Sequence, residues 1–255
     1  MRSVKIKEVI DALERFAPLP LQEEYDNAGL QVGLTEAEVS GALLCLDVTE
    51  RVVDEAITKG CNLIVAHHPL IFRKLSQVTD ANYVQRTVIK AIKNDIVIVA
   101  MHTNLDAAFG GVNFKIAEKL GLRDVRFFGR EKVVTNPLTD KKVTGGDGVI
   151  GCFDTPLAAD DLILLLKKEF DLECVQANEL LRREIRTVAL CGGSGSFLLQ
   201  DAINAGADAF ITGEMGYHEF FGHEQEIQLC VIGHYQSEQY TTEVLRDVIE
   251  RDCPG

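Results

Sequence analysis

Short apolar runs alternate with longer amphipathic segments along most of the chain. Residues 62–66, 95–100 and 227–232 are largely apolar and have the length of a buried strand. Residues 49–59 and 158–170 instead place apolar side chains three and four positions apart, which predicts helices with one buried face. Strands that are apolar throughout are typical of parallel sheets covered on both faces. The pattern therefore predicts an α/β fold with mainly parallel sheets flanked by helices.

The N-terminal segment is amphipathic and has no continuous apolar stretch. Five apolar residues recur at helical spacing and Ser3 precedes them as a candidate N-cap; the five are Ile6, Val9, Ile10, Leu13 and Phe16. This pattern predicts a first helix and argues against a signal peptide. No run in the chain approaches the roughly 20 apolar residues of a transmembrane helix.

Two stretches of the chain repeat the same pattern. Residues 42–68 align with residues 188–214 without a gap, and both read strand, turn, helix, glycine and strand. Identical pairs at equivalent positions include Cys45 and Cys191, Ala56 and Ala202, Ile57 and Ile203, and Gly60 and Gly206. Further along, residues 95–106 match residues 227–238, each a strand followed by a histidine and an acidic residue. We interpret the repeats as an internal duplication that gives two related α/β lobes.

The repeats set the expected domain limits. The first lobe is expected to cover residues 1–124 and the second residues 186–255, with the two lobes forming one compact unit. Residues 125–185 are less regular and predict a linker region with a short strand and a helix. Within it, the polar stretch "TNPLTDKKVTGGDG" is typical of a loop.

Charge and cysteine usage narrow the class of protein. The formal net charge of the 255 residues is −13, which disfavours nucleic acid and anionic membranes as partners. An anionic small molecule would need local compensation by a metal ion or by backbone amides. The seven cysteines are odd in number and form no C-x-x-C, which indicates a reduced, cytoplasmic protein without a disulfide framework.

Histidines and acidic residues gather where the predicted strands end. His67 and His68 follow one strand, and His102 with Asp106, His234 with Glu238, and Glu214 follow three others. Ligand sites form beyond the carboxyl ends of parallel strands, so these side chains are expected to meet. Imidazole and carboxylate suit zinc, iron(II), manganese or cobalt. Adjacent imidazoles could serve two ions about 3.5–4 Å apart, bridged by a carboxylate.

Other interpretations of the same residues stay open. A single histidine after a strand is often a hydrogen-bonded loop residue, Asp106 suits a turn, and His234 with Glu238 suits a surface pair. His218 and His223 are expected to be structural or exposed. The stretch "CGGSGS" (191–196) suits either a phosphate-binding loop or a tight turn. The stretch "YDNAGLQVG" (25–33) suits either a turn or the lip of a site.

Six motifs, in order along the chain, carry a resemblance to a known family. They are "YDNAGLQVG", "AHHPLIF", "HTNLDAAFGGVN", "CGGSGS", "ADAFITGE" and "GHYQSE". In these the chain resembles the NIF-three-like family, whose bacterial members are labelled GTP cyclohydrolase I type 2 homologues. The resemblance covers nearly the whole chain. It implies a two-lobed α/β fold, a toroidal homohexamer and a dinuclear metal site facing its interior.

The resemblance also implies which residues bind metal. By motif, the ligands would be His67, His68, Asp106, His234 and Glu238, the residues already selected at the strand ends. Some relatives carry an inserted domain, which the short stretch 125–185 indicates is absent or reduced. Relatives tend to continue beyond the point where Pro254 and Gly255 stand, which implies a trimmed end.

The expected activity is that of a dinuclear metal-dependent hydrolase. Two divalent ions (zinc, iron or manganese) would activate water for attack on the guanine ring of GTP. His102 is the candidate proton shuttle and Glu214 a second catalytic candidate. Few basic residues stand near these positions, Arg73 and Lys74 among them, and no motif identifies guanine. A metal-binding scaffold without catalysis, or a hydrolase of a phosphoester or peptide, are the alternatives.

Overall fold

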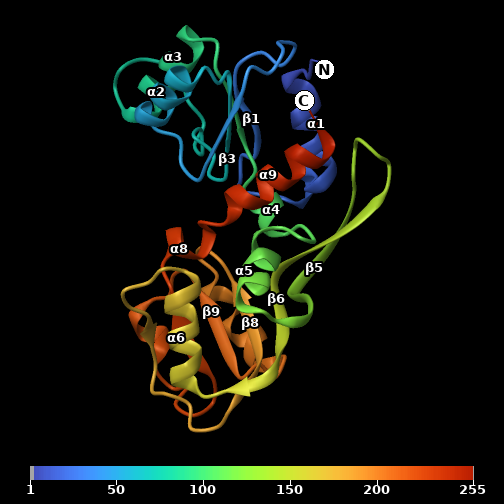
Figure 1. Ribbon diagram of the computed structural model, residues 1–255. Helices are drawn as coiled ribbons and strands as arrows, with labels where there is room; N and C mark the ends of the chain where they lie inside the picture. The colour runs from blue at the N-terminus through green and yellow to red at the C-terminus, as the bar shows by residue number, and fades with distance from the viewer. Residues whose placement is uncertain (1–2, 255) are drawn as a thin grey trace. The chain divides into compact units, whose positions relative to one another are not determined.

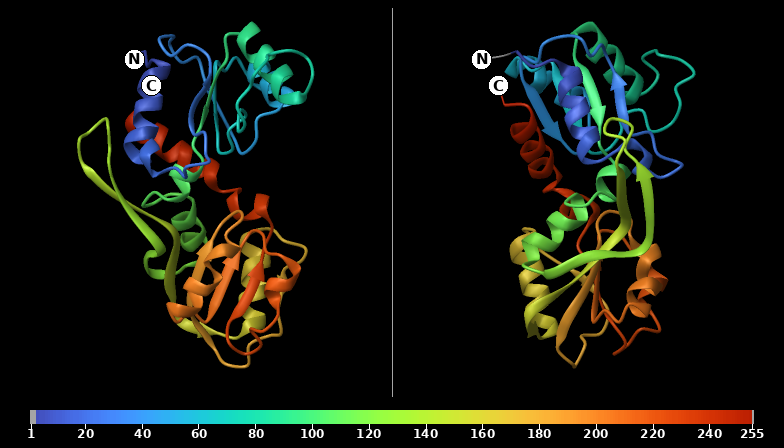
Figure 2. Two further views of the ribbon diagram at one scale, coloured as in Figure 1. Left: turned by 180° about the vertical axis from the view of Figure 1, so that it is seen from behind. Right: turned by 90° about the vertical axis from the view of Figure 1, so that its right-hand side faces the viewer.

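The computed structural model describes residues 3–254, which form two compact units. Unit 1 consists of the segments up to Ala108, Val134–Val143 and from Thr241 onward, and unit 2 of Phe109–Val133 and Thr144–Tyr240. Each unit contains one sheet with helices packed against it (Figures 1 and 2). The expected α/β class is therefore confirmed. The lobes expected from sequence are continuous, whereas each unit is assembled from separate segments.

The sheet of unit 1 has four strands. In spatial order they are β1 (Gly29–Val32), β4 (Val97–Ala100), β3 (Leu63–Ala66) and β2 (Ala42–Cys45). Strands β2, β3 and β4 are parallel, and β1 is antiparallel to β4. All residues of β3 and β4 are buried, as expected for parallel strands covered on both faces.

Helices cover both faces of this sheet (Figure 1). Helices α2 (Glu50–Lys59) and α3 (Tyr83–Lys93) pack on one face, and α1 (Ile6–Phe16) with α9 (Thr241–Asp252) lies on the other. The sequence sets the limits of α2. The Thr49 hydroxyl accepts a hydrogen bond from the Val52 N–H, and Gly60 ends the helix at φ 69°. The short elements η1 (Leu19–Leu21) and α4 (Thr103–Asp106) contact each other.

The sheet of unit 2 has six strands. In spatial order they are β5 (Arg123–Thr135), β6 (Lys142–Leu157), β8 (Ile185–Cys191), β9 (Ala209–Thr212), β10 (Gln228–Val231) and β7 (Gln176–Ala177). Strands β8, β9 and β10 are parallel, while β6 and β7 run antiparallel to their neighbours β8 and β10.

Helices also lie on both faces of the second sheet (Figure 2). Helices α5 (Val112–Leu120) and α6 (Ala159–Glu169) pack together on one face. Helix α7 (Leu199–Asn204) follows the turn η2 (Ser196–Leu198) and packs on the other face. The short elements η3 (Tyr217–Phe220) and α8 (His234–Glu238) follow β9 and β10.

The two sheets share an order of parallel strands. In each, three strands follow one another along the chain and side by side in the sheet, and a short helix comes after the third. This likeness agrees with the aligned segments of the sequence, and the internal duplication itself stays a prediction. The antiparallel strands β1, β6 and β7 have no counterpart in the expected mainly parallel arrangement.

Two local predictions were wrong. Ser3 does not cap α1, because residues 4 and 5 pair with residues 38 and 39 and the helix begins only at Ile6. Residues 142–148, expected in a loop, form the first part of β6. There the glycines make room for aromatic rings of β5. A Cβ on Gly146 would lie 2.7 Å from Phe127, and one on Gly148 would collide with Phe128.

No helix among residues 3–254 combines the length and the apolar character needed to cross a membrane.

We expect Ile64→Ala to lower the free energy of unfolding by about 2–5 kcal/mol. Ile64 lies in the middle of β3 with 0% of its surface exposed, so the shorter side chain leaves a cavity. Ile57→Ala is the matched control, because Ile57 is 42% exposed on α2 and its truncation should cost no more than about 0.5 kcal/mol. Urea denaturation followed by circular dichroism measures both, and equal losses would contradict the described packing.

Candidate metal centre

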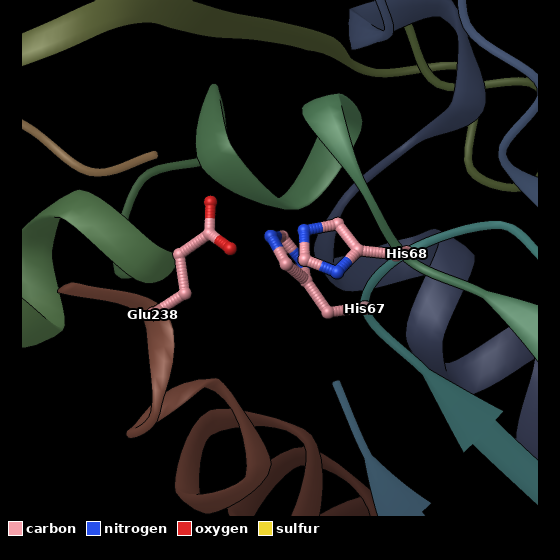
Figure 3. Close-up of side chains that lie close together, drawn as sticks. All are labelled: His67, His68 and Glu238. Carbon is pink, nitrogen blue, oxygen red and sulfur yellow. The ribbon is translucent and has the colours of Figure 1, made fainter. Parts of the chain in front are cut away.

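Two histidines continue β3 beyond its carboxyl end. The His67 N–H donates to the Cys45 carbonyl (3.1 Å) and the His68 N–H to the Leu46 carbonyl (2.8 Å), which extends the ladder with β2. Figure 3 shows their imidazole rings next to each other, with centroids 4.8 Å apart. A nitrogen of one ring lies within 4.8 Å of a nitrogen of the other. The backbone thus fixes two adjacent imidazoles at the end of the strand.

The ring of His67 is completely buried, and one hydrogen bond determines its tautomer. Its Nδ1 lies 2.8 Å from the carbonyl oxygen of Met101, which directly follows β4. A carbonyl only accepts, so Nδ1 carries the proton and Nε2 keeps the lone pair. Nε2 lies 3.6 Å from Oδ1 of Asp106. This arrangement is typical of a histidine that binds metal through Nε2.

His68 is held in the same way by a carboxylate. Its Nδ1 lies 2.9 Å from Oδ1 of Asp47, which stands just past the end of β2. In the neutral imidazole the proton again resides on Nδ1 and the lone pair on Nε2. The side chain of His68 is 23% exposed, so it is accessible, unlike that of His67.

A third imidazole, His102, follows β4 and precedes α4. Its Nδ1 lies 2.7 Å from Oδ1 of Asp26, and Oδ2 of Asp26 accepts from both the backbone N–H and the hydroxyl of Thr103. The Asp26 side chain is 0% exposed. Burial raises the pKa of this carboxyl, but the hydrogen bonds from His102 and Thr103 outweigh it and lower the pKa to about 2.

Three imidazoles and one carboxylate therefore gather in unit 1. The ring of His102 lies 5.4 Å from each of the rings of His67 and His68, measured between centroids. Asp106 ends α4 one turn after His102, and its N–H donates to the His102 carbonyl (3.0 Å). Its partly exposed carboxylate reaches back to His67. Three of the five predicted ligands, His67, His68 and Asp106, thus meet within one unit.

Unit 2 contains an imidazole between two carboxylates. His234 begins α8 and Glu238 ends it, with Nε2 of His234 3.2 Å from Oε2 of Glu238. Nδ1 of His234 lies 2.9 Å from Oε1 of Glu214. Hydrogen bonding to Glu238 raises the pKa of His234 to about 9 in spite of its burial, and Glu214 adds to the effect. Glu238, labelled in Figure 3, is only 4% exposed.

The glycine-rich loop after β8 supports these carboxylates. Gly193 has φ +60°, its N–H donates to the Ser237 hydroxyl (2.9 Å), and a Cβ there would lie 2.5 Å from Oε1 of Glu238. The hydroxyl of Ser194 donates to Glu214, which holds the pKa of Glu214 below its usual range. The loop is a tight turn lined by carboxylates, which would repel a phosphate.

A cavity of about 790 Å³ opens beside His234 and Glu214 in unit 2. Asp171, Glu173 and Gln176 also line the cavity. The rest of its lining comes mainly from the segments that follow β9 and β10. Its lining contains no lysine or arginine. A cationic or neutral group suits this cavity better than a bare polyphosphate does.

Comparison with known proteins identifies the family. The family model described as "Duf34/NIF3 (NGG1p interacting factor 3)" matches residues 4–255. The chain belongs to the Duf34/NIF3 family. The resemblance inferred from the six motifs is thus confirmed.

Curated and solved members of the family are similar over nearly the whole chain. A "GTP cyclohydrolase 1 type 2 homolog" of Clostridium acetobutylicum is 32% identical over 97% of this chain and 90% of its own length. One of Clostridium perfringens is 35% identical over 92% of this chain and 87% of its own. A Bacillus cereus protein related to NIF3 superposes with a TM-score of 0.84 at 25% identity, covering 98% of this chain and 94% of its own.

The structure adds residues that the sequence did not identify in this Duf34/NIF3 protein. Asp47 and Ser194 were missed. Asp47 stands two residues after β2 and Ser194 three residues after β8, and this place beyond a strand end is the signal that could have found them. Asp26 was identified in a turn or lip without a role, and it proves to hold His102. His218 is exposed and His223 pairs with Glu226, outside the clusters described above.

We expect Asp26→Asn to cost about 2 kcal/mol of unfolding free energy at pH 6. The folded-state pKa of Asp26 is about 2 against an ordinary 3.8, so its contribution is complete above about pH 4 and disappears as the pH falls through about 2. The difference between wild type and variant should therefore shrink on acidification. Urea denaturation at pH 6, 4 and 3 measures it. A difference that stays constant over this range would contradict the assigned charge state.

Proposed function

We propose that this Duf34/NIF3 protein is a hydrolase that depends on two divalent metal ions. The proposed ligands are His67, His68 and Asp106 from unit 1 and His234 and Glu238 from unit 2. One observation supports the proposal above the others: the three imidazoles among the proposed ligands share one arrangement. In each, Nδ1 faces a carbonyl or carboxylate oxygen, and in the neutral ring Nε2 then carries the lone pair.

The donor set fits a divalent transition metal. Histidine nitrogen and carboxylate oxygen suit zinc, iron(II) and manganese, and the choice among them follows availability. The acceptors behind the imidazoles, the Met101 carbonyl, Asp47 and Glu214, orient the rings and raise their basicity. When bound, such ions supply Lewis-acid chemistry and make water more acidic.

The remaining polar residues then have roles of their own. His102 would move protons, since Asp26 holds its Nδ1 and leaves Nε2 for exchange. Glu214 was expected to be catalytic, but its contact with Nδ1 of His234 favours a positioning role. Phe72 stands against His102 with ring centroids 6.2 Å apart and limits access of water to that face.

The names of the curated relatives support GTP as the substrate to test first. In the proposed reaction water attacks the guanine ring carbon C8 and the C8–N9 bond breaks, which leaves a formamide on the former N7. His102 takes the proton from the attacking water and delivers it to N9. The acidic lining beside His234 requires that the phosphates be neutralised elsewhere. The proposal includes assembly into a toroidal hexamer, and light scattering measures the molar mass that tests for six subunits. A metal-binding scaffold without catalysis is the competing function, in line with the family description "interacting factor".

We expect protein loaded with zinc, manganese or iron(II) to convert GTP to a formylated, ring-opened product with at least one of the three. Mass spectrometry identifies the product. Glu238→Gln should abolish turnover, because the buried carboxylate loses its charge while keeping its shape. Intact GTP after incubation with the fully loaded protein would reject this substrate and favour another hydrolysis or the scaffold.

We expect Gly193→Ala to weaken metal binding at least tenfold, an order-of-magnitude figure for a displaced ligand. The new Cβ would push Oε1 of Glu238 aside. Gly206→Ala is the matched control: its φ is +73°, but no atom lies within 4 Å of the added Cβ. Both variants should lose about 1 kcal/mol of stability from the left-handed backbone, and only the first should lose affinity for zinc. Equal affinities by titration calorimetry would exclude Glu238 as a ligand.

A further inference from the structure

Two exposed aromatic side chains stand beside the imidazoles of unit 1. Tyr25 is 68% exposed and Phe72 45% exposed, and their ring centroids lie 6.5 Å apart in an edge-to-face arrangement. Phe72 in turn contacts His102, with centroids 6.2 Å apart and rings nearly perpendicular. Large aromatic surfaces left in water next to a group of functional side chains are typical of a ligand site.

The backbone that carries these rings is held by hydrogen bonds. The Asn27 amide donates to the Ile71 carbonyl (2.6 Å), and the Ile71 N–H donates to Oε1 of Gln31 (3.1 Å). These bonds join the segment that carries Tyr25 to the segment that carries Phe72. Next to Tyr25, Asp26 is anchored to Thr103. Exposed rings on segments tied together in this way are positioned before any ligand arrives, which lowers the entropic cost of binding.

Positive charge follows directly after the aromatic pair. Arg73 and Lys74 are exposed, and among residues 3–254 no ion pair with a carboxylate involves either of them. They supply the charge compensation that a phosphate would need and that the acidic cavity of unit 2 lacks.

We propose that Tyr25, Phe72, Arg73 and Lys74 form a nucleotide-binding rim. The flat face of a heteroaromatic base packs against Tyr25 and Phe72, and the phosphates bind Arg73 and Lys74. The base then lies beside His102, the proton-transfer residue of the proposed function. In that placement the inference rests on the proposed function, but binding to the rim needs no turnover.

Calorimetric titration of the zinc-loaded protein with guanosine and with guanosine monophosphate tests the rim. Phe72→Leu removes the ring and keeps the apolar volume, and Tyr25→Leu is a second, independent variant. Each substitution should lower the affinity for both guanosine and guanosine monophosphate by about tenfold, the usual effect of losing one base-stacking ring. Tyr83→Leu is the matched control, because Tyr83 is a 56% exposed tyrosine on α3 of the same unit, and it should bind as the wild type does.

A second pair of measurements separates the contribution of the aromatic rings to binding from that of the positive charges. Arg73→Gln combined with Lys74→Gln should lower the affinity for guanosine monophosphate several-fold and leave the affinity for guanosine unchanged, since only the monophosphate carries a phosphate group. Added salt should reduce the binding of the monophosphate to the wild type and not to the double variant. Thermal melts check that each variant is folded.

Several outcomes would overturn the proposal. One is guanosine affinity that is the same in wild type, Phe72→Leu and Tyr25→Leu; another is the absence of guanosine binding by the wild type. A change in the oligomeric state of either leucine variant, with base binding intact, would assign the rings to contact between copies of the chain. None of these outcomes depends on GTP turnover. The rim can therefore stand if the hydrolase proposal fails, and fall if it succeeds.

Discussion

The hydrogen bond between Nδ1 of His67 and the Met101 carbonyl is the contact on which the site of unit 1 depends. An imidazole with none of its surface exposed needs an acceptor for its N–H, since burying a polar group without one costs roughly 1–3 kcal/mol. The acceptor is the main chain at the end of the neighbouring parallel strand. The register between β3 and β4 therefore decides both the tautomer of His67 and the direction in which its lone pair points.

Much of this arrangement could be predicted from the sequence. Apolar runs located β3, β4 and β10, and the polar residues directly after them gave the candidate ligands, because parallel strands end at one edge. The glycine at the end of α2 was likewise recognisable. These features were predictable because each depends on residues that are close together in the sequence.

Other features were not predictable because they depend on partners distant in sequence. Asp26 and Asp47 are ordinary loop aspartates until the fold brings them to His102 and His68. The glycines at the start of β6 suggested a loop. They are accommodated in a strand because the aromatic rings of Phe127 and Phe128, on the neighbouring strand β5, occupy the space where their side chains would be. The edge strand β1 was missed because its four residues carry little periodic signal.

The course of the chain has a consequence for the order in which the protein folds during synthesis. Helix α9 packs on α1 and against β2, so unit 1 is completed only by residues that are made after those of unit 2. All of unit 2 lies between residues 109 and 240 and emerges earlier. The sheet formed by β1 to β4, which ends in the two histidines after β3, therefore lacks the contacts of α9 while unit 2 is synthesised and folds. Such a nascent chain exposes apolar surface until α9 has been made, which makes it prone to aggregation at that stage.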